Sequence, residues 1–217
     1  ARFAEGRSGW GVRWDTLGRP ERMPDCLAGL SETKLPWLLI AGLRTAEDAR
    51  SATEPGRALA ARVLLEAASP SDARTWATLP CDGLVVKANE AGGGVGPTSA
   101  FLLLQDLRGG LERPFWIQGA WGPATAAAAH LAGAEGIVLC EELWLARESP
   151  LSDEERRRMA LLDGSETVCL GTGPAQVRLF AQADRSALTE LQREIDSGAA
   201  WPETLHRRWL QRPEDGG

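Results

Sequence analysis

The sequence predicts an α/β fold in which parallel strands alternate with helices. Segments typical of strands and of helices alternate about six times, at a spacing of roughly 20–30 residues, which favours a parallel sheet with helices outside it. A (β/α) barrel and an open doubly wound sheet both satisfy this pattern. Because a complete eight-fold barrel typically needs about 250 residues, a barrel formed by this chain of 217 residues is expected to lack one or two units or to close irregularly.

Short apolar runs bounded by glycine, proline or polar clusters predict the strands. In chain order they cover residues 9–15, 37–43, 62–67, 84–86, 115–118 and 137–140. The character of the sequence changes at Asp163. Beyond it, residues 167–170 and 176–180 flank a glycine-rich turn and predict a β-hairpin. We therefore expect a shortened barrel-like domain over residues 1–162 and a hairpin and helical extension packed on it over residues 163–217.

N-cap residues mark the expected helix starts. Ser69, followed by a proline and then an acid, is typical of a helix N-terminus, and Ser152 with Glu155 forms a capping box. A break at Pro55-Gly56 is expected to follow the helix over residues 45–51. The predicted helices cover residues 25–30, 45–51, 69–78, 98–107, an alanine-rich stretch ending near 132, and residues 152–160, 186–195 and 202–210.

The stretch from Asp82 to Gly96 is the centre of the expected site. A buried strand runs directly into a loop with four glycines among the five residues 92–96. Glycine lets the backbone approach a ligand closely and adopt positive φ, and α/β proteins bind ligands at the C-terminal ends of parallel strands. We expect a ligand shelf here, and the alternative is a simple hinge. Its candidate residues are Lys87, Asn89, Glu90, Gly92, Gly93 and Gly94.

A second candidate loop follows the strand that ends at Gln118. The loop from Gly119 to Gly122 leads into a helix N-terminus, where free N–H groups and the helix dipole suit a phosphate. An ordinary turn between a strand and a helix is the alternative interpretation.

Composition argues against several classes of function. The net charge of −6 argues against nucleic acids or an anionic membrane surface as partners. No apolar run approaches the roughly 18 residues that span a bilayer, and no signal peptide opens the chain, so we expect a soluble, cytoplasmic protein. The sequence begins at Ala1 rather than Met, which agrees with an excised part of a longer protein.

The cysteines and histidines give little support for metal or acid–base chemistry. No C-x-x-C pair and no zinc-type spacing is present, and we interpret Cys26, Cys81, Cys140 and Cys169 as reduced core thiols. His130 and His206 are expected to be packed or solvated side chains rather than catalysts, because neither is near the glycine loop.

Three segments, taken in order, resemble one known family. They are residues 82–96 (DGLVVKANEAGGGVG), 114–122 (PFWIQGAWG) and 132–149 (AGAEGIVLCEELWLARES). Together they resemble the nitronate monooxygenase (2-nitropropane dioxygenase-like) family of FMN-dependent TIM barrels, which includes flavin enoyl reductases of polyketide and polyunsaturated fatty acid synthases. The resemblance covers about residues 60–150. It implies a TIM-barrel-like fold, FMN as cofactor and NADPH as reductant.

The chain departs from the pattern of that family at three places. Gly94 stands where the family carries a histidine near the flavin, and Ala120 replaces the second glycine of the phosphate loop. Cys140-Glu141 stands where the family has the Gly-Thr that helps to hold the FMN phosphate. A carboxylate repels a phosphate in a partly buried site. The resemblance therefore implies a degenerate, shortened member.

Two side chains of the shelf are candidates for catalysis. Lys87 can contact a flavin or a phosphate, and its alternative is a solvated lysine at a strand end. Glu90 can act as a base or hold the loop through backbone N–H groups.

Two functions remain open from the sequence. The first is an FMN-binding oxidoreductase, an enoyl-reductase-like domain within a polyketide or fatty acid synthase. Its expected partners are the other synthase domains and an acyl carrier protein. The second is a catalytically inactive structural or docking domain of such a synthase. Flavin content separates the two.

Overall fold

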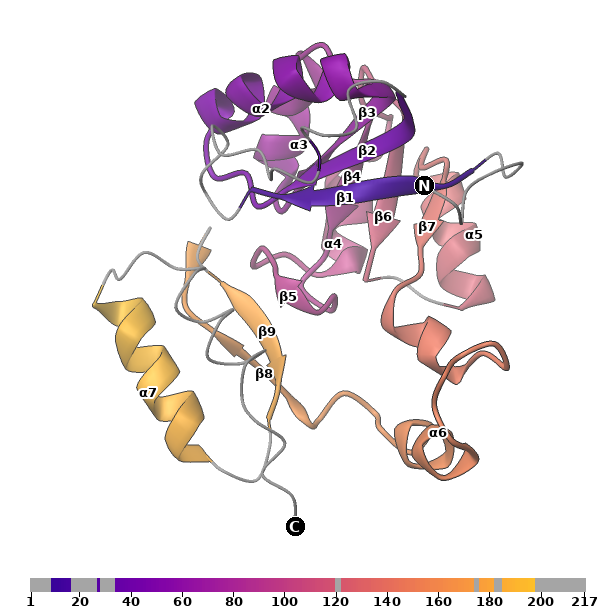
Figure 1. Ribbon diagram of the computed structural model, residues 1–217, viewed down its shortest axis with the longest axis vertical. Coiled ribbons are helices and arrows are strands. Elements are labelled where there is room, and N and C mark those ends of the chain that lie inside the picture. Colours follow the sequence, from indigo (N-terminus) through magenta and orange to yellow (C-terminus); the bar gives the residue numbers. More distant parts are fainter. Residues whose placement is uncertain are drawn as a thin grey trace.

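The computed structural model describes residues 9–16, 27, 34–119, 122–173, 176–181 and 185–197. Most of the predicted helix over 25–30, the whole of the predicted helix over 202–210, Ala120, Cys26 and His206 lie outside these ranges. Within them, six parallel strands form one sheet in the order β1-β2-β3-β4-β6-β7 (Figure 1). The strands are β1 (Gly11–Asp15), β2 (Leu35–Ala41), β3 (Ala60–Ala67), β4 (Gly83–Lys87), β6 (Phe115–Gln118) and β7 (Gly136–Val138).

The strand order decides between the two predicted architectures. A doubly wound sheet reverses its order at a switch point, whereas each successive strand of this sheet adds to the same edge. The fold is therefore a TIM-barrel-like parallel (β/α) repeat, as predicted. It is incomplete, because the described residues supply six of the eight strands of a full barrel. The connecting helices are α2 (Ala46–Leu59), α3 (Pro70–Ala77), α4 (Ala100–Asp106) and α5 (Pro123–Leu131).

The predicted helix end near residue 51 is wrong, because α2 continues through Pro55 to Leu59. The missing proline N–H would have bonded to the carbonyl of Ser51, an exposed residue whose carbonyl water can hydrate. Gly56 then lets the helix pack closely on the sheet, since a Cβ at this position would lie 2.8 Å from Ile40 Cδ1. The N-terminus of α2 is fixed by a capping box between Thr45 and Asp48.

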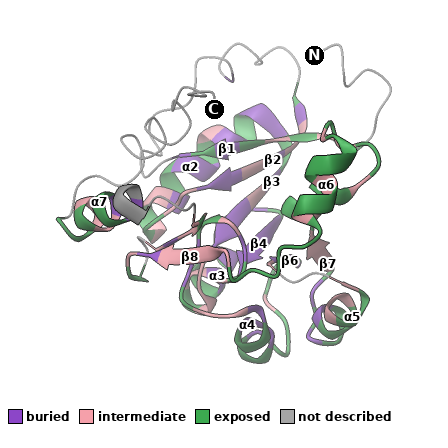
Figure 2. Ribbon diagram, turned by 90° about the horizontal axis from the view of Figure 1, so that it is seen from below, coloured by how far each residue is buried: buried purple, intermediate pink, exposed green. Residues whose placement is uncertain are grey.

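The two faces of the main sheet differ in character. The helix-facing side is a continuous apolar core, and Figure 2 shows much of β2, β3 and β4 as buried. The opposite, inner face is more polar and includes Glu66 and Lys87, which alternate along their strands with the core residues. Trp116 fills part of this inner face. Its ring would lie 2.9 Å from a Cβ on Gly83, so glycine at this position makes room for it, whereas a Cβ on Gly136 would be in ordinary contact with the ring at 3.4 Å.

A second, smaller sheet lies at the C-terminal side of the chain. β8 (Thr167–Leu170) and β9 (Val177–Phe180) form the predicted antiparallel hairpin, and α7 (Arg185–Asp196) follows it. The third strand, β5 (Gly93–Gly94), belongs to the glycine loop and pairs with β9. A small core made of Leu170, Val177, Leu188 and Leu191 joins α7 to the hairpin. The structure therefore attaches the C-terminal hairpin directly to the expected site.

The segment after β7 also departs from the prediction. The strand predicted over residues 137–140 ends at Val138, and Cys140 is the N-cap of a short 3-10 helix, η1 (Glu141–Leu145). The capping box of Ser152 and Glu155 starts α6 (Asp153–Met159) as expected. No helix within the described ranges is both long and apolar enough to cross a membrane.

Candidate functional site

Lys87 is buried at the C-terminal end of β4. Its side chain is 2% exposed and lies with Nζ 3.9 Å from Oε1 of Glu66, the next-to-last residue of β3. The Glu66 carboxylate in turn contacts Arg13, whose Nη2 reaches across β2 to within 3.1 Å of Oε2. Since an isolated buried charge is very unfavourable, the two cations and the carboxylate hold one another in place. This burial excludes the interpretation of Lys87 as a solvated strand end.

The glycine loop lies over Lys87. A Cβ on Gly93 would lie 3.7 Å from Lys87 Nζ, and the backbone of Gly93 has a φ of 76°, which other residues adopt only with strain. Gly96 is pressed against the preceding loop, where a Cβ would come within 1.7 Å of the carbonyl oxygen of Ala68. Gly93 is thus favoured by its backbone conformation and Gly96 by its close contact.

Asn89 and Glu90 hold this loop in place. Oε2 of Glu90 accepts a hydrogen bond of 2.9 Å from the backbone N–H of Ala100, the first residue of α4. Nδ2 of Asn89 donates to the carbonyl of Gly96 at 3.2 Å, and its Oδ1 accepts from Arg178 on β9. The geometry favours the structural interpretation of Glu90 over a role as base.

Gln118 lies beside Lys87 at the same end of the sheet. The two residues are paired in register on β6 and β4, and Gln118 is also buried. Its Nε2 donates to Sγ of Cys140 at 3.1 Å. Burial raises the pKa of the Cys140 thiol, and the nearby Glu141 carboxylate raises it further, although Lys87 opposes this. The Cys140 thiol is therefore held in its neutral form.

The turn between β6 and α5 has the features of a phosphate site. Gly119 and Gly122 both have positive φ, of 95° and 92°, and no atom lies within 4 Å of a Cβ placed on Gly122. Gly122 is the N-cap of the nine-residue helix α5, which begins without a side-chain cap. A Cβ on Gly119 would lie 2.9 Å from the backbone nitrogen of Ala91, so Gly119 packs against the residue that precedes the glycine loop.

The carboxylate of Glu141, the first residue of η1, lies against the glycine loop. Oε1 of Glu141 would lie 2.5 Å from a Cβ on Gly92, so the Glu141 side chain packs directly on the glycine loop. Glu142 accepts a hydrogen bond of 2.9 Å from the backbone N–H of Cys140. FMN would find free N–H groups at the N-terminus of α5, a cation at Lys87 and an amide at Gln118. The negative charge of Glu141 would instead repel the FMN phosphate.

Several residues of the site were not anticipated from the sequence. Glu66 had one signal, its place at the end of a predicted strand. Arg13 and Arg178 had none, because the first acts across an intervening strand and the second comes from the C-terminal hairpin. The structure places Lys87, the glycine loop, Gln118 and Gly119 at the same end of the sheet. Among the described residues, no cluster of three or more His, Cys, Asp or Glu side chains is placed to hold a metal ion.

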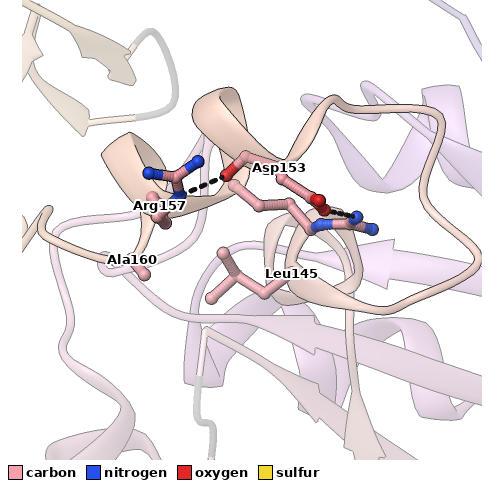
Figure 3. A pocket seen from close by; sticks show the side chains of 5 residues that line it. Leu145, Asp153, Arg157 and Ala160 are labelled. Carbon is pink, nitrogen blue, oxygen red and sulfur yellow. Dashed lines mark hydrogen bonds and ion pairs between the residues drawn. The ribbon is translucent and has the colours of Figure 1, made fainter.

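A separate cavity of about 440 Å³ lies between η1 and α6 (Figure 3). It is lined by Leu145, Asp153, Arg156, Arg157 and Ala160. The guanidinium of Arg156 is only partly exposed, because it bonds to Asp153 and to the backbone oxygens of residues 146 and 147. The charges in this cavity are thus satisfied locally.

The fold is similar to those of several solved structures, although sequence identity is low. FabK from Thermotoga maritima matches with a TM-score of 0.68 and 20% identity over 93% of this chain and 63% of that chain. The enoyl reductase domain of MlnA, from the macrolactin biosynthesis cluster of Bacillus amyloliquefaciens, matches with a TM-score of 0.62 and 10% identity over 88% of this chain and 56% of that chain. Nitroalkane oxidase from Streptomyces ansochromogenes matches with a TM-score of 0.57 and 19% identity over 81% of this chain and 52% of that chain.

At these identities the likeness shows the fold alone. The chain spans at most 63% of the length of the structures it matches here. No family model matches the sequence, and no curated protein matches it either.

Proposed function

We propose that this chain is an FMN-binding oxidoreductase-like module of the enoyl reductase and nitronate monooxygenase kind. The observation that carries the proposal is the buried Lys87, which lies under a glycine loop at the C-terminal ends of the strands, beside the buried Gln118. Barrels of this architecture place their ligands at that end of the sheet. The sequence resemblance and the enoyl reductase and nitroalkane oxidase among the structural neighbours support the same assignment.

The residues present suggest how FMN would be held. The uncapped N-terminus of α5 after Gly122 would receive the phosphate, and Lys87 and Gln118 would offer polar groups to the ring. Bound FMN would supply hydride and electron transfer, with NADPH as the reductant. Glu66 holds the Lys87 side chain in place from 3.9 Å, so that this cation favours an anionic or electron-rich group beside it. Asn89, Glu90 and the glycines shape the covering loop.

We further propose that the module works within a polyketide or fatty acid synthase, with other synthase domains and an acyl carrier protein as partners. The likeness to an enoyl reductase domain from a macrolactin biosynthesis cluster supports this setting. An activity on thioester substrates would follow from it.

One observation favours a second candidate, a catalytically inactive structural or docking domain of such a synthase. Glu141 packs on the glycine loop where the family pattern has a neutral phosphate ligand. Gly94, in place of a histidine, adds to this alternative.

The visible spectrum of the purified protein tests the proposal. After incubation with FMN and gel filtration, absorbance bands near about 370 and 450 nm in roughly equimolar amount support a flavin module. NADPH consumption with an enoyl thioester then separates an enzyme from a flavin-binding domain. A colourless protein that takes up no FMN contradicts the proposal and supports the inactive domain.

A further inference from the structure

The C-terminal hairpin is fastened to the glycine loop by Arg178 on β9. Its Nε donates to the backbone oxygen of Asn89 and its Nη2 to Asn89 Oδ1, both at 2.6 Å. Its Nη1 donates to Oγ1 of Thr167 on β8 at 2.7 Å. The guanidinium therefore joins two segments that are 89 residues apart in the sequence. Hydrogen bonds from a charged, forked donor of this kind are stronger than neutral ones.

The backbone contacts at this junction are few. β5 consists of Gly93 and Gly94 alone, which pair with Arg178 and Val177, and the N–H of Val95 adds one bond of 2.9 Å to the carbonyl of Gln176. Glycine loses more conformational freedom on ordering than any other residue, so a two-residue glycine strand is weak by itself. A long contact of 3.7 Å from Asn89 Nδ2 to Cys169 Sγ adds little, so the side chain of Arg178, with its three short hydrogen bonds, is the main anchor of the loop to the hairpin.

The anchored loop is the one that covers Lys87. Asn89 is two residues beyond Lys87, and Gly93 lies beside the Lys87 ammonium. We infer that Arg178 is the positioning residue of the site: by binding both the backbone and the side chain of Asn89, it sets the glycine loop over Lys87 and so shapes the ligand shelf. The predicted consequence for FMN affinity rests on the proposed function, whereas the consequence for loop order does not.

The experiment compares amide hydrogen exchange and FMN binding in Arg178→Leu, Arg178→Lys and the unchanged protein. Arg156→Leu is the matched control, because it removes a part-buried arginine that also bonds to three oxygen acceptors, at the η1–α6 junction. Exchange over residues 84–86 in β4 reports whether each variant keeps its core. The FMN dissociation constant is measured by fluorescence titration.

In Arg178→Leu, exchange at residues 93–95 should accelerate at least about tenfold, while β4 stays protected. The exchange rate in Arg178→Lys should lie between those of Arg178→Leu and the unchanged protein, since an ammonium can replace one hydrogen bond of the guanidinium but not all three. FMN should bind about tenfold more weakly to Arg178→Leu and be partly restored in Arg178→Lys, with Arg156→Leu unchanged in both measurements.

Unchanged exchange at residues 93–95 in Arg178→Leu overturns the inference. If Arg178→Leu loses protection in β4 as well, the comparison is made on Arg178→Lys, where exchange equal to that of the unchanged protein overturns it. If the unchanged protein binds no FMN but its loop loosens in Arg178→Leu, the positioning role stands and the proposed function fails.

Discussion

The Nζ atom of Lys87 lies 3.9 Å from Oε1 of Glu66, and both side chains are almost fully buried where β3 and β4 end side by side. Arg13 contacts the same carboxylate from β1. Glu66 is therefore the anion that compensates two cations on the inner face of the sheet. This charge balance explains how a lysine can lie buried under the glycine loop.

Glu66→Gln should destabilise the protein more than Lys87→Met. The first change removes the anion beside the buried Lys87, whereas Arg13 keeps Asp15 at 3.5 Å, and it should lower the free energy of unfolding by about 3–5 kcal/mol. The second leaves Glu66 paired with Arg13 and should cost about 1–2 kcal/mol. Chemical denaturation of both variants measures this order, and a larger loss in Lys87→Met would contradict the charge balance described here.

Gly96→Ala and Gly94→Ala form a matched pair within the glycine loop. A Cβ on Gly96 would meet the carbonyl oxygen of Ala68 at 1.7 Å, and relieving that overlap should cost about 2–3 kcal/mol of stability. A Cβ on Gly94 has no atom within 4 Å, so its substitution should change stability by less than about 0.5 kcal/mol. Thermal unfolding of the two variants distinguishes them, and equal midpoints would refute the close contact at Gly96.

Glu141→Gln should strengthen FMN binding. The substitution removes a negative charge that packs on the glycine loop while keeping the shape of the side chain. The dissociation constant of FMN should fall about three- to tenfold, which corresponds to about 1 kcal/mol for one partly solvated charge near a phosphate. Glu154→Gln, an exposed carboxylate on α6, is the control and should leave the constant unchanged. Weaker binding in Glu141→Gln would place the phosphate elsewhere.

Cys140 should react slowly with alkylating reagents at neutral and mildly alkaline pH. Its pKa is raised by burial and then by Glu141, so the reactive thiolate forms only at higher pH than in an ordinary cysteine. Since folding favours the protonated thiol, its contribution to stability is lost as the pH rises through the raised pKa. The rate of iodoacetamide modification against pH, followed by mass spectrometry, should show this shift.

In Glu141→Gln the same modification should become faster at a given pH, because one of the groups that raise the pKa of Cys140 is gone. An unchanged rate profile would show that burial alone sets the reactivity of this thiol.

The repeated strands and helices were predictable because they are local. A short apolar run followed by an N-cap such as Ser69 specifies its own structure. The continuation of α2 through Pro55 could not be predicted in this way, because the packing of Gly56 against Ile40 supports the helix from outside the segment. Local rules for proline could not include that contact.

The site was predictable only in part. Lys87 and the glycine loop stand together in the sequence, and the end of a parallel strand marks them as a ligand site. The contacts that fix them are long-range: Arg13 is 53 residues from Glu66, and Arg178 is 89 residues from Asn89. A two-residue strand such as β5 has no periodicity to detect, so its pairing with the hairpin could be seen only in the structure.

The most direct measurement of the central claim is a fluorescence titration of the unchanged protein with FMN and, in parallel, with riboflavin. The account predicts saturable binding of about one FMN per chain, with riboflavin bound at least about tenfold more weakly because it lacks the phosphate that the α5 N-terminus would receive. Absence of saturable FMN binding, or equal affinity for the two flavins, would contradict a flavin phosphate site at the turn from Gly119 to Gly122.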